Sequence, residues 1–180
     1  MYGMVNKAVK ALVVEKFGES QWVAIRDRAG APDDFVGLQA YDDALTYGLV
    51  VAAVDVLGVP ADQILFGFGE YWVLRIATVS YADLMNATGS DMVSFLENVD
   101  AMHSRIKMTM PALNPPSFRV KRIDDRQIQV DYFSSRQGLL PFVHGIIAGL
   151  SAHYGQPCSV TMIDNSGSRV PSERMILSLG

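Results

Sequence analysis

The sequence predicts an α+β fold, with a mostly helical N-terminal half and a C-terminal half that combines an antiparallel sheet with helices. Two observations indicate this fold. Apolar residues recur at helical spacing from the N-terminus to about residue 110. After a group of prolines, the pattern changes to the period of two that is typical of strands, and one further helical stretch interrupts it. With 180 residues, the chain has the size of a single domain.

The N-terminal half is predicted to contain four helices that are separated by glycines and prolines. They cover residues 4–17, 19–29, 42–57 and about 61–77. The first three each stop at a glycine, and Asp42 or Asp43 is a suitable cap for the third. The fourth contains the run ILFGFGEYWVLRIA, which is apolar nearly all round, as expected of a segment buried between other elements.

The C-terminal half is predicted to contain a long helix, two hairpins and one further helix. A short helix at residues 81–87 precedes the long one, which starts near Gly89 and cannot continue through Pro111. The remaining elements are strands at about 118–123 and 128–136 around the turn IDDRQ, a helix at 139–154, and a final hairpin with strands at 158–164 and 173–179 around a turn at 165–172.

Composition excludes several classes of protein. A formal net charge of -4 argues against a nucleic-acid-binding protein, which needs a clustered basic surface. The single cysteine, Cys158, excludes an intramolecular disulfide and a cysteine-cluster zinc site, and it fits the reducing cytoplasm. Charged residues interrupt the apolar N-terminus, so we expect neither a signal peptide nor a membrane-spanning segment. The sequence therefore predicts a cytoplasmic protein.

The long helix places a histidine on its apolar face. Met92, Leu96, Val99, His103 and Ile106 follow one another at steps of four and three residues, so His103 is expected to point inward. A buried imidazole is either a core residue satisfied by hydrogen bonds or a ligand of a metal or cofactor. His144 and His153 show no ligand pattern. Asp100 lies one helical turn before His103 and is interpreted as a solvated carboxylate, with an orienting role as the alternative.

A row of hydrogen-bond donors follows 29 residues later. Tyr132, Ser134 and Arg136 occupy alternate positions of a predicted strand and would share one face, with the outer two roughly 13 Å apart. The row is either the polar face of an amphipathic strand or a site for a ligand with several carboxylate oxygens. Together with a buried imidazole, it matches the two ends of haem, whose iron needs a histidine and whose propionates need donors.

The chain resembles the haem nitric oxide/oxygen binding domains, the H-NOX family, which includes bacterial gas sensors and the haem domain of soluble guanylate cyclase. The matching segments, in order along essentially the whole chain, are MYGMVNKAV, FGEYWV, ENVDAMH, PPSF, YFSSR and GLLPFVHGIIAGL. YFSSR fits the family motif Tyr-x-Ser-x-Arg. The resemblance is to a stand-alone bacterial member. It implies one domain over residues 1–180, with a helical distal lobe at about 1–60, an α+β proximal lobe at about 61–180, and haem between them.

The resemblance also implies roles for particular residues. His103 matches the proximal ligand of haem b (iron protoporphyrin IX), and Pro116, or Pro115, matches a proline that distorts the porphyrin. Tyr132, Ser134 and Arg136 match the residues that bind the propionates. On the distal side, oxygen-binding members carry a tyrosine where this chain has Phe142. Trp72, Met4 and Val5 are expected to line the same pocket, although the indole N–H of Trp72 is a possible donor to a bound gas.

These matches predict a nitric oxide sensor rather than an enzyme. Phe142 cannot donate a hydrogen bond to bound oxygen, so the site is expected to take nitric oxide, or carbon monoxide, and to exclude oxygen. Nitric oxide would weaken the bond between His103 and iron and so switch a partner. The sequence contains no output module, so by resemblance to stand-alone bacterial members we expect a histidine kinase or a cyclic-di-GMP enzyme in trans. The alternative is a piece of a larger sensor, whose output would be fused to it. The alternatives are an oxygen-binding haem protein, a carrier of another carboxylated apolar ligand, and an enzyme with His103 as general base.

Overall fold

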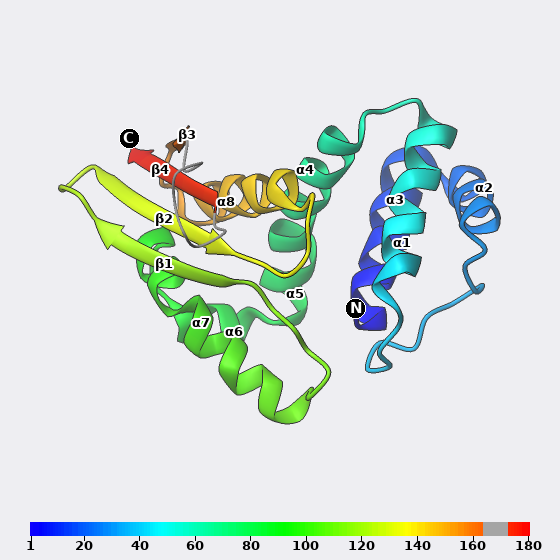
Figure 1. Ribbon diagram of the computed structural model, residues 1–180, viewed down its shortest axis with the longest axis horizontal. Coiled ribbons are helices and arrows are strands. Elements are labelled where there is room, and N and C mark those ends of the chain that lie inside the picture. The colour runs from blue at the N-terminus through cyan, green and yellow to red at the C-terminus, as the bar shows by residue number, and fades with distance from the viewer. Residues whose placement is uncertain (164–172) are drawn as a thin grey trace.

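The computed structural model describes residues 1–163 and 173–180 and shows an α+β fold, as predicted (Figure 1). Helices α1, α2 and α3 lie together on one side of the molecule. The sheet lies on the other side with α7 and α8, and α4 runs between the two groups (Figure 1). Two hydrophobic cores correspond to these two sides. The turn predicted at 165–172 lies outside the described residues.

The N-terminal lobe is a bundle of three helices. They are α1 (Gly3–Phe17), α2 (Glu19–Ala29) and α3 (Asp43–Leu57), close to the predicted bounds. Asp42 is the cap of α3, because its side chain accepts a hydrogen bond from the backbone N–H of Ala44 at 2.8 Å. Asp43, the other candidate cap, is therefore the first residue of the helix, and its carboxylate is available for other contacts.

The fourth predicted helix is divided in the structure. It comprises α4 (Ala61–Tyr71), a π-helical segment η1 (Trp72–Ala77) and the short α5 (Thr78–Ser80). The wider π turns change which side chains face inward. Phe68 and Tyr71 pack in the N-terminal core, whereas Val73 and Ala77 pack in the C-terminal core. The π segment thus lies where the chain passes from one core to the other.

Helix α8 (Leu140–Tyr154) crosses α4 with the two backbones in contact. A Cβ added to Gly145 would lie 2.0 Å from the carbonyl oxygen of Phe66, and one added to Gly69 would lie 2.1 Å from the carbonyl oxygen of Phe142. Only glycine fits at these two positions, so the crossing holds α4 firmly against α8.

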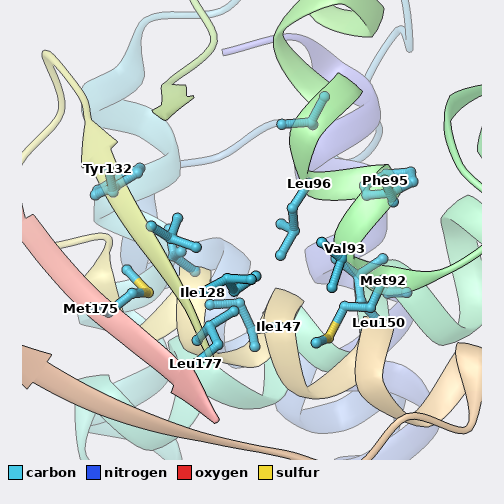
Figure 2. Packing of buried hydrophobic residues seen from close by; sticks show 14 of the residues in the cluster. Met92, Val93, Phe95, Leu96, Ile128, Tyr132, Ile147, Leu150, Met175 and Leu177 are labelled. Atoms are coloured by element: carbon cyan, nitrogen blue, oxygen red, sulfur yellow. The ribbon is translucent and has the colours of Figure 1, made fainter. Parts of the chain in front are cut away.

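The C-terminal lobe packs two helices against one face of a four-stranded antiparallel sheet of order β1-β2-β4-β3. The strands are β1 (Ser117–Arg122), β2 (Gln127–Phe133), β3 (Cys158–Ile163) and β4 (Glu173–Leu179). Side chains of β2 and β4 meet those of α8 and of α7 (Met92–Thr109), as Figure 2 shows for Ile128, Leu177, Ile147 and Leu96. The short α6 (Ala82–Thr88) precedes α7, which begins at a capping box formed by Asp91 and Ser94.

Within the described residues, no single helix has the length and apolar character needed to cross a membrane. The stretches Asp43–Leu57 and Ala61–Ser80 reach that length and composition only as a pair, and they are bent by 116° relative to each other.

Candidate functional site

His103 lies on α7, half-buried between the helix and the segment that follows it. The predicted apolar stripe is confirmed, because Met92, Leu96 and Val99 are buried in the C-terminal core. Atom Nδ1 of His103 is buried and has no hydrogen-bond partner among the described residues. The backbone of Pro116 lies beside the ring and acts on it, so one ring nitrogen can be held there while the other is offered to a ligand, as in metal-binding histidines. Nε2 of His144 shares this lack of a partner among the described residues, so burial alone does not distinguish a ligand from a core histidine.

The surroundings of His103 favour the neutral imidazole. Burial lowers its pKa, and the carboxylate of Asp100 and the backbone of Pro116 oppose that effect. Only the neutral ring has a nitrogen lone pair to offer to a metal ion. The contribution of Pro116 also shows that the proline after α7 lies next to the imidazole.

Asp100 is not the solvated carboxylate that its position suggested. It is half-buried and accepts hydrogen bonds from the hydroxyl of Ser117 and from the backbone N–H of Phe118, the latter at 2.9 Å. These bonds attach α7 to the start of β1 across the segment 110–116, which we call the proline crossing. Asp100 therefore fixes the position of the chain that passes His103, and the orienting alternative is the correct one.

The three predicted donors do not share a strand face, because β2 ends at Phe133. Tyr132 is in the strand, where its ring is 5 % exposed and packs against that of Phe118. The hydroxyl of Ser134 accepts a hydrogen bond from the backbone N–H of Arg136 at 3.0 Å, which stabilises a turn in place of the ladder. The prediction of a continuous strand to residue 136 is therefore wrong, and Ser134 is exposed.

The turn directs Arg136 toward the N-terminal lobe. Its Nε and Nη2 atoms donate to the carboxylate of Asp43 at 2.6 and 3.2 Å, and Nη1 donates to the carbonyl of Asn114. Burial raises the pKa of Tyr47, and Arg136, Asp43 and Tyr132 all act on it electrostatically. Tyr47 thus lies near both the Arg136 guanidinium and the phenol of Tyr132, at the boundary between the lobes.

Two of the predicted distal residues lie in one aromatic cluster. The ring of Phe142 is 5.2 Å from that of Phe68, which in turn meets Trp72 edge-on at 6.2 Å. Val5 packs against the N-terminal core, and the sulfur of Met4 accepts a hydrogen bond from the hydroxyl of Tyr81 at 3.7 Å, across the lobe boundary. Phe68, the centre of the cluster, was missed because the run FGFGEYW is apolar all round and favours no single face.

Three features of the chain fit haem, which the resemblance implies. His103 supplies a buried, unpartnered ring nitrogen within the described chain. Phe142 and Trp72 supply apolar aromatic surface, and Arg136 and Tyr132 supply a cation and a phenol for carboxylates at the lobe boundary. A nitrogen ligand, an apolar wall and carboxylate donors are the groups that an iron porphyrin with propionates requires.

Comparison with known families agrees with this chemistry. A family model described as Haem-NO-binding matches residues 2–162. The chain therefore belongs to the Haem-NO-binding family, whose members are the H-NOX domains of haem-based gas sensors. Such domains bind haem and act as sensors rather than as catalysts.

The relatives include animal guanylate cyclases. Soluble guanylate cyclase gcy-31 of Caenorhabditis elegans is 28% identical over 152 residues, which cover 84% of this chain and 22% of that protein. The soluble subunit beta-2 of guanylate cyclase from Rattus norvegicus is 33% identical over 93 residues, or 52% of this chain and 14% of that protein. The chain thus spans about a fifth of the length of the curated relatives it matches first.

Solved structures share the whole fold. The H-NOX protein of S. oneidensis in the Fe(II)NO ligation state has a TM-score of 0.87 at 20% identity, with 100% of this chain and 99% of that chain covered. A point mutant of the H-NOX protein from K. algicida, in the unliganded Fe(II) state, has a TM-score of 0.85 at 20% identity, with 100% and 97% covered. At these identities, the likeness shows the fold alone.

Proposed function

We propose that this chain is a nitric oxide sensor that holds ferrous haem b through His103. The observation that supports the proposal is the position of His103: its half-buried ring lies beside the backbone of Pro116, and burial lowers its pKa, so a ring nitrogen is available to a metal ion. Arg136, Tyr132 and Ser134 would hold the propionates, and Pro116, or Pro115, would lie against the macrocycle. Phe142, Trp72, Met4 and Val5 line the distal side. When bound, ferrous haem supplies an open coordination position at which nitric oxide or carbon monoxide can bind.

The residues around His103 turn the loss of its bond to iron into movement. With haem bound, His103 would hold α7 to the iron, and release of His103 would free the helix from that link. Asp100 still attaches α7 to β1, so the helix and the strand shift together. The C-terminal lobe then changes its position relative to the N-terminal lobe, which gives the two states that a switch requires.

The distal residues select the gas. Phe142 has no hydrogen-bond donor, so bound oxygen, which is polar, gains no stabilisation from it, whereas nitric oxide needs none. The Trp72 indole meets Phe68 edge-on and acts as a packing residue. The signal passes to a partner in trans, a histidine kinase or a cyclic-di-GMP enzyme, as in the stand-alone sensors that the sequence resembles.

The test is haem binding by variants of two histidines. His144 is the matched control, because its Nε2 atom is also buried without a partner among the described residues. We expect His103→Ala to lose haem and to regain it when free imidazole is supplied, whereas His144→Ala keeps haem. Absorption spectra of the reconstituted ferrous proteins measure both. A wild-type protein that takes up no haem, or a His103→Ala variant that keeps it without imidazole, would contradict the proposal.

A further inference from the structure

One ion pair joins the two lobes at the edge of the proposed haem site. Asp43 opens α3 in the N-terminal lobe, and Arg136 follows β2 in the C-terminal lobe. The pair is bidentate, with contacts of 2.6 and 3.2 Å from the guanidinium to the two carboxylate oxygens. The Arg136 side chain is 18% exposed and that of Asp43 is 37% exposed, so water screens this pair less than an ordinary surface ion pair.

Arg136 is held from a second direction as well. Nη1 donates to the carbonyl of Asn114, which lies in the proline crossing after α7, and the Asn114 amide donates to the hydroxyl of Ser135 at 2.9 Å. We call Asp43, Asn114 and Arg136 the interlobe clasp. It joins α3, the crossing that passes His103 and the turn after β2. The amino group of Met1 also donates to Asp43, at 2.6 Å.

The clasp leaves part of the guanidinium free. An arginine side chain has more N–H groups than the three atoms engaged here use, since each Nη atom carries two. The remaining N–H groups can donate to a ligand carboxylate while Asp43 and Asn114 keep their contacts. The hydrogen bonds from Arg136 also hold the pKa of Asp43 below its usual value, so the carboxylate stays charged at neutral pH.

We propose that Asp43 is the positioning residue for Arg136, and that through it the hold on the haem carboxylates depends on the lobes staying together. This inference rests on the proposed function, because it assigns Arg136 to those carboxylates. Asp43 acts from the distal lobe without touching haem. When the lobes separate, the guanidinium loses its hydrogen bonds to Asp43, and its hydrogen bonds to the haem carboxylates weaken.

The first experiment is a double-mutant cycle on haem release. Haem dissociation into excess apomyoglobin is measured for the wild type, Asp43→Asn, Arg136→Gln and the double variant. We expect Asp43→Asn to raise the dissociation rate about tenfold, the effect typical of losing a residue that orients a ligand-binding group. The double variant should release haem no faster than Arg136→Gln alone, because Asp43 acts only through Arg136.

The matched control is Asp55→Asn. Asp55 lies on the same helix and pairs at 2.6 Å with Arg28 inside the N-terminal lobe, so its loss costs an ion pair without touching the clasp. We expect Asp55→Asn to release haem at the wild-type rate, even if its thermal unfolding midpoint falls as much as that of Asp43→Asn. Additive effects in the cycle, slower release from Asp43→Asn, or equal release from Asp43→Asn and Asp55→Asn would overturn the proposal.

A second measurement tests the clasp independently of haem. Spin labels at Lys16, in the N-terminal lobe, and Lys121, in β1, report the distance between the lobes in the full chain with Cys158→Ser, with and without haem. We expect Asp43→Asn to broaden or lengthen that distance in both forms and Asp55→Asn to leave it unchanged. If the wild type takes up no haem, the proposed function is contradicted. If the distance between the labels is unchanged in Asp43→Asn, the proposed role of the interlobe clasp is contradicted.

Discussion

At the scale of single residues, the proposed function gives Phe142 the role of deciding which gas the site accepts. Its ring packs on Phe68 and offers no donor. We expect Phe142→Tyr to form an oxygen complex of the ferrous protein that persists in air, because a phenol hydroxyl stabilises bound oxygen by about 1 kcal/mol or more. Phe142→Leu is the control, since it removes the ring without adding a donor. Absorption spectra in air distinguish the variants, and a persistent oxygen complex of the wild type would refute the role of Phe142.

The sequence predicted site residues whose roles follow from their own type and local spacing. His103 is such a residue, because helical periodicity alone places its ring inward. The role of Asp43 could not be predicted in this way, because its position in the sequence suggested only a helix cap. Its contact with Arg136 forms only when two lobes that are far apart in the sequence pack together. Phe68 was missed for a related reason, since an all-apolar run does not show which side chain meets Phe142.

At the scale of secondary-structure elements, the crossing of α4 and α8 sets the frame around the site. A Cβ at Gly145 would meet the backbone oxygen of Phe66 at 2.0 Å, so Gly145→Ala must push the helices apart. We expect a destabilisation of about 2 kcal/mol, as for other overpacked cores. Urea unfolding measures this loss.

The control for the crossing is Gly67→Ala on the same helix α4. A Cβ at Gly67 meets nothing within 4 Å, so the alanine should stabilise the helix by about 0.5–1 kcal/mol. If Gly145→Ala proved as stable as the wild type, α4 and α8 would not be held at backbone contact.

Periodicity located most elements, and it failed where side chains or tertiary packing override the local pattern. The donors appeared to continue β2 to residue 136, yet the hydroxyl of Ser134 bonds the backbone of Arg136 and ends the strand at Phe133. The helix after Pro60 was expected to be uniform, but its π segment arises where it must serve two cores in succession. The sequence pattern of residues 128–136 does not indicate the early end of β2, and that of residues 61–77 does not indicate the π segment.

At the scale of the whole molecule, the described residues join the two lobes through α4 with its π segment, through α8 and through polar contacts. The α4 helix and its π segment contribute to both cores. The interlobe clasp is one polar link, and the hydroxyl of Tyr47, which donates to the carbonyl of Gln137 at 3.0 Å, is another. Such a joint allows the lobes to move relative to each other while each core stays intact. The proposed link through His103 would be the one that a gas can break.

The most direct test of this account is the electron paramagnetic resonance spectrum of the ferrous protein with nitric oxide, recorded with ¹⁵N-labelled histidine and with ¹⁴N-histidine. If His103 holds the iron and is released, the absorption spectrum of the unliganded ferrous protein is that of histidine-bound haem, and this spectrum is lost on adding nitric oxide. The resulting signal then shows hyperfine coupling to the nitrosyl nitrogen alone and is the same for both labels. A signal that changes with the histidine label would show that the bond to His103 survives and would contradict the switch.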